Sequence, residues 1–301
     1  MGLFPSYLSN RKQVVVVDGV KSSVKDVQAG VPQGSRLGPL LFIIYINDIS
    51  KDLESEILIF ADDTTLLASG TDPTETTEIL NRDLTKISNW ASKWKINFNP
   101  KKSKDMIFSK KCIGNSLPVM LNNTLIERVF SHKHLGIYIT TTLDWSLQVD
   151  QVCLKANKKL SILRSVKYLQ RKTLDMLYKV IVRSVIDYGM PIYFNNLRQT
   201  EIAKINKVQY RAAKIVTGAL NLTSQVKLEQ ELGWETIQNR ANYLGVTLFH
   251  KIHLYETRPL IRKLMPPLID FSEYDLRNKY PYVNFPFHTM SISKSYFPYY
   301  T

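Results

Sequence analysis

Two adjacent carboxylates are the residues of this sequence best suited to chemistry. Asp62 and Asp63 lie in the segment FADDTTLL, between an apolar run at 57–60 and strand-like residues at 65–67. Because aspartate is disfavoured inside strands and neighbouring anions repel, a tight hairpin turn is the simplest geometry for the pair. At the edge of a buried sheet, two carboxylates most naturally face a hard cation. The alternative is an ordinary solvated turn, where aspartate is common.

A glycine-rich loop precedes this pair in the chain. The segment AGVPQGSRLGPLLF contains Gly30, Pro32, Gly34 and Gly38. Such a loop at the start of a helix can bring backbone N–H groups close to a phosphate or a base, although similar loops also serve as plain turns. The residues from Pro39 onward are apolar nearly all round and predict a buried helix.

A row of cations marks a helix in the second half of the chain. The apolar spacing predicts this helix over about 201–217, and Gly218 is expected to end it. Four basic residues at i, i+3, i+7 and i+10 share a face beside its apolar side; this basic ridge consists of Lys204, Lys207, Arg211 and Lys214. The ridge lacks interspersed acids, so we expect it to contact phosphate groups, although many such ridges are only solvated.

The composition narrows the class of protein further. The 301 residues carry a formal net charge of +14 and a pI near 9.6, which favours a polyanionic partner such as nucleic acid. Only two cysteines occur, without metal-ligand spacing. This argues against a disulfide scaffold and a zinc site and favours a reducing compartment, so we expect the cytoplasm or the nucleus. No apolar stretch is long enough to span a bilayer, and no membrane partner is expected.

Different elements are predicted for the two halves of the chain. In the first half, a β-branched run precedes the hairpin turn Asp18-Gly19, and Asp72 and Pro73 begin the clearest helix, which ends near Trp94. From Asp144 onward only helices are predicted, and their buried stripes are expected at Val149, Val152, Ala156, Leu160 and Leu163, at Leu174, Leu177, Ile181 and Val185, and at Ile205, Val208, Ala212 and Ile215. The predicted fold class is α+β, with an antiparallel sheet and packed helices over residues 1–142 and an all-α region over 143–301.

Four motifs taken together resemble a known family. The segments AGVPQGSRLGPLLF, FADD, NFNPKKS and HLGIYI, in this order and spacing, are similar to the reverse transcriptases of non-LTR retrotransposons of the jockey-like type. Four later segments, YGMPIYFN, QYRAAKIVTGA, ELGWETIQNRANYL and DLRNKYPY, resemble the helical region that follows the polymerase in those elements. The resemblance covers nearly the whole chain. It implies an RNA-directed DNA polymerase with part of a palm domain, followed by a thumb-like helical region.

The resemblance also implies roles for particular residues. In two-metal nucleotidyl transfer, a primer 3′-hydroxyl attacks the α-phosphate of a dNTP. Asp62 and Asp63 would bind Mg²⁺, or Mn²⁺ in its place, and Lys102 would be a candidate acid for the pyrophosphate leaving group. Contacts to the nascent base pair would come from Gln33, Gly34 and Ser35.

The same resemblance places nucleic acid along the rest of the chain. Leu135 and Gly136 would fall in the primer grip, and the basic ridge would lie on the duplex backbone. The implied partners are an RNA template, a DNA primer or duplex, and dNTPs.

One part of the family pattern was not found. The family has a further aspartate on an earlier palm strand, in a pattern like F-x-D. Asp18 is the upstream aspartate considered for this role, but it lies in a D-G turn. We therefore expect a fragment of a longer element that is inactive alone, unless another chain supplies the missing palm strand. A non-catalytic nucleic-acid-binding remnant that uses the basic helical region is the alternative, and a degenerate product without function is a third reading.

Overall fold

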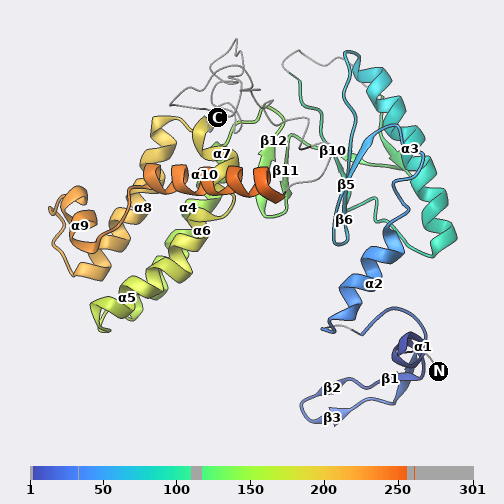
Figure 1. Ribbon diagram of the computed structural model, residues 1–301, viewed down its shortest axis with the longest axis horizontal. Coiled ribbons are helices and arrows are strands. Elements are labelled where there is room, and N and C mark those ends of the chain that lie inside the picture. Colours follow the sequence, from blue (N-terminus) through green and yellow to red (C-terminus); the bar gives the residue numbers. More distant parts are fainter. Residues whose placement is uncertain (1–2, 33, 110–116, 256–260, 262–301) are drawn as a thin grey trace, which may run out of the picture. The chain divides into compact units, whose positions relative to one another are not determined.

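The computed structural model describes residues 3–32, 34–109, 117–255 and 261. The chain forms two compact units, Met1–Val129 and Phe130–Thr301. Helices and small two-stranded sheets are mixed along the chain (Figure 1), which agrees with the predicted α+β class. The functional boundary predicted between residues 142 and 143 stays a prediction. None of the described helices is long and apolar enough to cross a membrane.

The first unit contains short strands and three described helices. Its helices are α1 (Leu3–Leu8), α2 (Leu37–Ile46) and α3 (Pro73–Trp94). Its antiparallel pairs are β1 (Arg11–Gln13) with β4 (Lys25–Val27), β2 (Val16–Val17) with β3 (Val20–Lys21), β5 (Glu56–Phe60) with β6 (Asp63–Leu67), and β8 (Met120–Leu121) with β9 (Thr124–Leu125). A parallel pair joins β7 (Lys104–Asp105) to β10 (Glu127–Arg128).

Two local predictions in this unit are confirmed. The D-G turn joins β2 to β3, with positive φ angles of 48° at Asp18 and 81° at Gly19, as expected for a tight two-residue hairpin. Helix α3 begins as predicted, because the Asp72 side chain accepts a hydrogen bond from the N–H of Thr74 at 2.9 Å and Pro73 occupies the first turn.

The prediction that the helix after Pro39 is buried is wrong. In α2 only Gly38 and Ile46 are buried, whereas Leu40, Ile43 and Ile44 are 52%, 57% and 63% exposed. The cause is the small core of this unit: its only buried apolar cluster among the described residues consists of Val119, Leu121 and Ile126. Within this unit, the described elements leave the other faces of α2 unburied.

The second unit consists of one hairpin and a helical body. The hairpin pairs β11 (Ser131–His134) with β12 (Ile137–Thr140). The helical elements are α4 (Ser146–Ser165), α5 (Arg171–Leu177), the π-helix η1 (Tyr178–Arg183), α6 (Ser184–Asp187), α7 (Met190–Tyr193), the 3₁₀ turn η2 (Phe194–Asn196), α8 (Gln199–Thr217), α9 (Gln225–Leu232) and α10 (Ile237–Tyr255).

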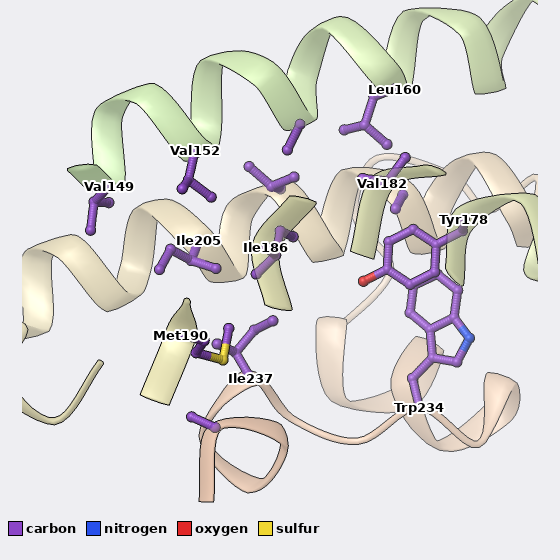
Figure 2. Packing of buried hydrophobic residues seen from close by; sticks show 14 of the residues in the cluster. Val149, Val152, Leu160, Tyr178, Val182, Ile186, Met190, Ile205, Trp234 and Ile237 are labelled. Atoms are coloured by element: carbon purple, nitrogen blue, oxygen red, sulfur yellow. The ribbon is translucent and has the colours of Figure 1, made fainter. Parts of the chain in front are cut away.

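A continuous apolar core holds this body together. Figure 2 shows side chains from α4, α6, α7, α8 and α10 meeting in it, among them Val152, Ile186, Ile205 and Ile237. The stripe predicted for α4 is fully buried. On α8, Ile205, Val208 and Ala212 are buried as predicted, whereas Ile215 is only partly buried. At one end of the core, the ring of Tyr178 stacks on Trp234 with centroids 4.0 Å apart.

The stripe predicted after Leu174 is shifted by one residue. Leu174 is buried as expected, but Leu177, Ile181 and Val185 lie only at the margin of the core. The buried positions are instead Tyr178, Val182 and Ile186. From Leu174 to Ile186 the buried positions recur every four residues, and the π-helix allows this spacing because its turn holds more residues than the 3.6 of an α-helix.

Candidate active site and nucleic-acid interface

The paired aspartates lie at a tight hairpin, as predicted. Strands β5 and β6 pair from Glu56↔Leu67 to Phe60↔Asp63, so Ala61 and Asp62 form the connection and Asp63 begins β6. Ala61 has a φ of 53°, a region that an L-residue with a Cβ enters at a cost.

The prediction that this tip lies at the edge of a buried sheet is wrong. Asp62 and Asp63 are both exposed, and Phe60 beside them is 64% exposed. In the part of the chain that the structure describes, β5 and β6 form a sheet of two strands whose side chains are exposed or half-buried. Both carboxylates are therefore directly accessible to a ligand from solvent.

A buried carboxylate that sequence reasoning missed anchors the start of this hairpin. The side chain of Asp83, on α3, is fully buried and accepts hydrogen bonds from the backbone N–H groups of Glu54 and Ser55 and from the Ser55 hydroxyl. The Lys86 ammonium also donates to it, at 3.0 Å. Burial alone would raise the pKa of Asp83, but these hydrogen bonds outweigh it and hold the pKa below its usual value. The sequence pattern around Asp83 does not distinguish it from an aspartate on the solvent-facing side of a helix.

The glycine loop has the backbone conformations that its sequence predicts. Gly30 and Gly34 have φ angles of 80° and 79°, which favour glycine. The Ser35 hydroxyl accepts a hydrogen bond from Gly38 N–H at 3.0 Å and donates to Pro32 O at 2.8 Å, so it fixes the entry into α2. The hydroxyl of Tyr7 also donates to it. Gln33, predicted to contact template or dNTP, lies outside the described residues.

Lys102 lies on a turn that an asparagine organises. Asn99 accepts hydrogen bonds from the N–H groups of Lys101 and Lys102 through its side chain, and its backbone oxygen accepts from Lys102 and Ser103. The Lys102 side chain is exposed. The NPKK segment therefore presents its ammonium groups to solvent, as a phosphate-contacting residue requires.

The two carboxylates of the hairpin supply some of the ligands that a divalent metal needs. Mg²⁺ is commonly held by one or two carboxylates together with waters and substrate phosphates. Asp62 and Asp63 supply ligands of this type, but no group of three or more His, Cys, Asp or Glu side chains in the described part of the chain could hold a metal. The pair fits Mg²⁺ as an open part of a site, not as a complete cage.

An upstream aspartate was also overlooked in the sequence. Besides Asp18, Asp26 precedes Gly30; it lies in the exposed strand β4, opposite Lys12. Within the described residues, neither aspartate joins a group of three potential metal ligands.

The basic ridge of α8 runs alongside α4. Lys204 donates to Asp150 at 2.6 Å, and Arg211 donates to the Asn157 side chain at 3.1 Å. Lys214 lies over the ring of Tyr210 at 4.5 Å. Asp150 on the neighbouring helix α4 is therefore an acidic partner of the ridge, and the sequence of α8 alone did not reveal it.

The helix beside the ridge adds further positive charge. From Gln151 to Leu174 the chain has no acid, and its cations are Lys155, Lys158, Lys159, Arg164, Lys167, Arg171 and Lys172. Cys153 lies on α4 near Lys204 and Arg211; burial raises the pKa of its thiol to about 11, and the Asp150 charge adds to this effect. The thiol therefore stays protonated at neutral pH and is not a nucleophile.

The hairpin of the HLGIYI motif is fixed to the helical body. Its turn residues Leu135 and Gly136 have φ angles of 45° and 87°. The Tyr188 hydroxyl donates to the backbone oxygen of Leu135 at 2.6 Å, and a Cβ on Gly136 would meet the Tyr188 ring at 3.1 Å. Sequence reasoning did not single out Tyr188, because this contact joins residues 53 positions apart.

Comparisons with known proteins agree with the motifs. The profile of the family described as reverse transcriptase (RNA-dependent DNA polymerase) matches residues 3–248. The RNA-directed DNA polymerase from mobile element jockey of Drosophila funebris is 30% identical over 238 residues, covering 72% of this chain and 25% of that protein. The jockey polymerase of Drosophila melanogaster is 27% identical over 272 residues, covering 86% of this chain and 29% of that protein.

A third relative lies outside the jockey elements themselves. The probable RNA-directed DNA polymerase from transposon X-element of Drosophila melanogaster is 27% identical over 250 residues, which cover 80% of this chain and 27% of that protein. No solved structure matches the chain. The chain spans about a quarter of the length of these curated relatives. On the strength of the family profile, the chain belongs to the reverse transcriptase family and is similar to the jockey-like enzymes of non-LTR retrotransposons.

Proposed function

We propose that this chain is the part of a non-LTR retrotransposon RNA-directed DNA polymerase that binds the catalytic metal and the nucleotide. The observation that carries the proposal is the family match over residues 3–248, combined with a tight hairpin that presents Asp62 and Asp63 to solvent. The substrates are an RNA template, a DNA primer and dNTPs, and the working compartment is the cytoplasm or the nucleus.

In this proposal the hairpin holds divalent cations for two-metal nucleotidyl transfer. Asp62 is the principal ligand, and Asp63 is a second ligand or adds negative charge beside it. Bound Mg²⁺, or Mn²⁺, supplies Lewis-acid charge for the attacking and leaving oxygens. The exposed position of both carboxylates supports this role, since substrate phosphates must complete the coordination.

The surrounding motifs orient the substrates. Gln33, Gly34 and Ser35 lie along the nascent base pair, where the positive φ of Gly34 gives the backbone close access. Lys102, exposed on the turn that Asn99 organises, donates a proton to the departing pyrophosphate. The helical unit serves as a thumb, with the basic ridge on the duplex backbone.

Polymerisation in this proposal requires a third carboxylate. Mg²⁺ demands near-octahedral geometry, and the described residues bring no third acidic side chain to Asp62 and Asp63. We therefore propose that the chain is inactive alone and that an additional palm strand, from a longer polypeptide or a partner chain, completes the site.

A chimera tests the catalytic role. Residues 3–248 replace the aligned stretch of the Drosophila funebris relative, and primer extension on an RNA template is measured with Mg²⁺ and Mn²⁺. The chimera is expected to incorporate dNTPs, and Asp62→Asn to lower incorporation by roughly 100-fold or more. Asp26→Asn is the matched control and is expected to leave the rate unchanged. A chimera that binds primer–template but extends nothing would refute the proposal.

The isolated chain tests the need for a third carboxylate. Purified full-length chain is expected to give no extension in the same assay, both as wild type and as Asp62→Asn. Incorporation by the wild type that Asp62→Asn abolishes would show that the chain polymerises unaided.

A second function, nucleic-acid binding without chemistry, is favoured by the basic ridge and the acid-free stretch of α4. Contacts of this kind release counterions, so affinity for RNA or DNA should fall steeply with salt. Lys207→Glu combined with Arg211→Glu is expected to weaken binding, whereas Lys227→Glu combined with Lys251→Glu, on α9 and α10, should have a smaller effect. Affinity that does not change with salt would contradict this function.

A further inference from the structure

A cleft of about 300 Å³ lies between the β11–β12 hairpin and the helices α4 and α6. Its polar lining includes Lys133, Gln151, Lys155, Ser184 and Tyr188. No carboxylate is among the lining residues, and neither lysine forms a described salt bridge in the part of the chain that the structure covers. The cleft therefore has a mainly apolar surface with two lysines at its lining and no carboxylate among the lining residues.

Three contacts hold the walls of this cleft in place. The Gln148 side chain accepts a hydrogen bond from Tyr138 N–H at 3.0 Å and joins α4 to β12. The Tyr188 hydroxyl binds the Leu135 carbonyl at the hairpin turn. Ile137 packs so closely on Gly189 that a Cβ there would come within 2.5 Å of it. The hairpin and the helices thus form one preorganised surface.

The chemistry of the lining suits a nucleotide. Exposed lysine ammonium groups bind phosphate as point charges. The Tyr188 ring, 57% exposed, offers a flat face to a base or sugar, and aromatic rings of this kind stack on bases regardless of sequence. Val152 and Val185 add an apolar wall beside it. The volume lies at the lower end of ligand clefts, roughly 300–1,000 Å³, and suits one unit of a strand better than a duplex.

We propose that this cleft binds one nucleotide of a single nucleic-acid strand, with phosphate oxygens on Lys133 and Lys155 and the sugar or base against Tyr188. The proposal rests on the proposed function. Lys133 and Lys155 lie outside the motifs that carry the family resemblance, and Tyr188 begins the segment YGMPIYFN, for which the resemblance implies no binding role. Tyr188 has two tasks: its ring contacts the strand, and its hydroxyl is a positioning group that fixes the hairpin turn beside it.

The lysines are tested by strand binding in full-length protein. Fluorescence anisotropy with a labelled 12-nucleotide single strand, as RNA and as DNA, is measured over a salt series. Lys133→Gln combined with Lys155→Gln is expected to weaken binding roughly tenfold at low salt and to reduce the slope of log K against log salt by about 0.7 for each phosphate that no longer meets a lysine. The matched control, Lys227→Gln combined with Lys251→Gln, removes the same charge from exposed positions on α9 and α10 and is expected to stay within about twofold.

Tyrosine variants separate the ring from the hydroxyl. Tyr188→Phe is expected to weaken binding roughly two- to tenfold, because the hydrogen bond to the Leu135 carbonyl is removed, without changing the salt slope. Tyr188→Ala is expected to weaken binding roughly tenfold or more, again at an unchanged slope, because both lysines still meet their phosphates. A strand that carries 5-iodouracil is expected to photo-cross-link to the peptide that contains Tyr188, and circular dichroism melting checks that each variant is folded.

The results distinguish this proposal from the function on which it rests. If the wild type binds the strand but the double-lysine variant binds equally well and no cross-link forms at Tyr188, the cleft proposal is overturned and the proposed function stands. If the wild type binds neither single strands nor primer–template, the proposed function itself fails. If inorganic phosphate binds the cleft but strands do not compete with it, the site is an anion site only and the proposal is overturned.

Discussion

The carboxylate of Asp83 accepts two hydrogen bonds from one residue, Ser55: one from its backbone N–H and one from its hydroxyl, both at 2.7 Å. Ser55 immediately precedes β5, and the far end of β5 leads into the turn that carries Asp62. A buried acid on α3 therefore fixes the start of the strand whose end presents the candidate metal ligands.

Asp83→Asn is expected to destabilise the first unit by about 2–3 kcal/mol. The amide is uncharged, and its NH₂ group faces N–H donors that the carboxylate now satisfies, so buried groups lose their partners. Hydrogen-exchange mass spectrometry of peptides that span β5 and β6 should reveal faster exchange there. Glu78→Gln, an exposed acid on the same helix, is the control and should leave exchange unchanged.

The pH dependence of stability follows from the pKa of Asp83. Because the folded pKa is lowered, the contribution of Asp83 to stability is complete above the pKa of an unfolded aspartate, about 3.9. It is lost as the pH falls through the lower folded pKa. Protection of β5 should therefore decrease below about pH 4 in the wild type, and this decrease should be smaller in Asp83→Asn. Equal acid sensitivity of the two proteins would contradict the assignment.

A second buried carboxylate predicts similar acid sensitivity in the helical unit. Burial would raise the pKa of Glu201, but hydrogen bonds from Arg198 and Ser146 outweigh it and lower the pKa. Its contribution is thus present above the pKa of an unfolded glutamate, about 4.3, and is lost at lower pH. Glu201→Gln should reduce the acid-induced decrease in melting temperature of this unit.

Ala61→Gly is expected to stabilise the β5–β6 hairpin by about 0.5–1 kcal/mol. The φ of 53° costs an alanine about 1–2 kcal/mol, which exceeds the entropy cost of a glycine. Slower exchange of β5 amides would confirm the gain. Ala68→Gly, after β6 and without a positive φ, supplies the comparison and should be slightly destabilising.

Gly189→Ala is expected to destabilise the helical unit by about 2–4 kcal/mol. The new Cβ would lie 2.5 Å from the Ile137 Cδ1 atom, and the alanine would have to adopt a φ of 68°. Gly233→Ala is a matched control, since Gly233 also has a positive φ, 62°, but nothing lies within 4 Å of its Cβ position. Thermal unfolding should show the larger loss for Gly189→Ala; equal losses would mean that Ile137 moves freely aside.

Sequence patterns predicted the elements that depend on local rules. The turn at Asp18-Gly19, the cap at Asp72 and the end of α8 at Gly218 follow from turn and capping chemistry within a few residues. The apolar stripe of α4 was also predicted, because one regular helix packs one face against the core.

Features that depend on distant partners were not predictable in this way. The burial of α2 was wrongly predicted, because an apolar helix is buried only if another layer covers it. The stripe after Leu174 was misassigned by one residue, because periodicity assumes an α-helix and the chain forms a π-helix there. Asp83 and Tyr188 carry no local signal at all, since their partners lie 28 and 53 positions away.

The β5–β6 hairpin is built from contacts between residues that are close in the sequence. Its outermost pair is Glu56 with Leu67, so every bond in it is local, and such hairpins close in roughly 1–10 μs. The contact between Lys204 and Asp150, by contrast, joins residues 54 positions apart. A nascent polypeptide synthesised only to the end of α3 already contains Asp83 and both strands. We therefore expect the mutual arrangement of Asp62 and Asp63 to depend on the first unit alone and to survive mutations that melt the helical unit.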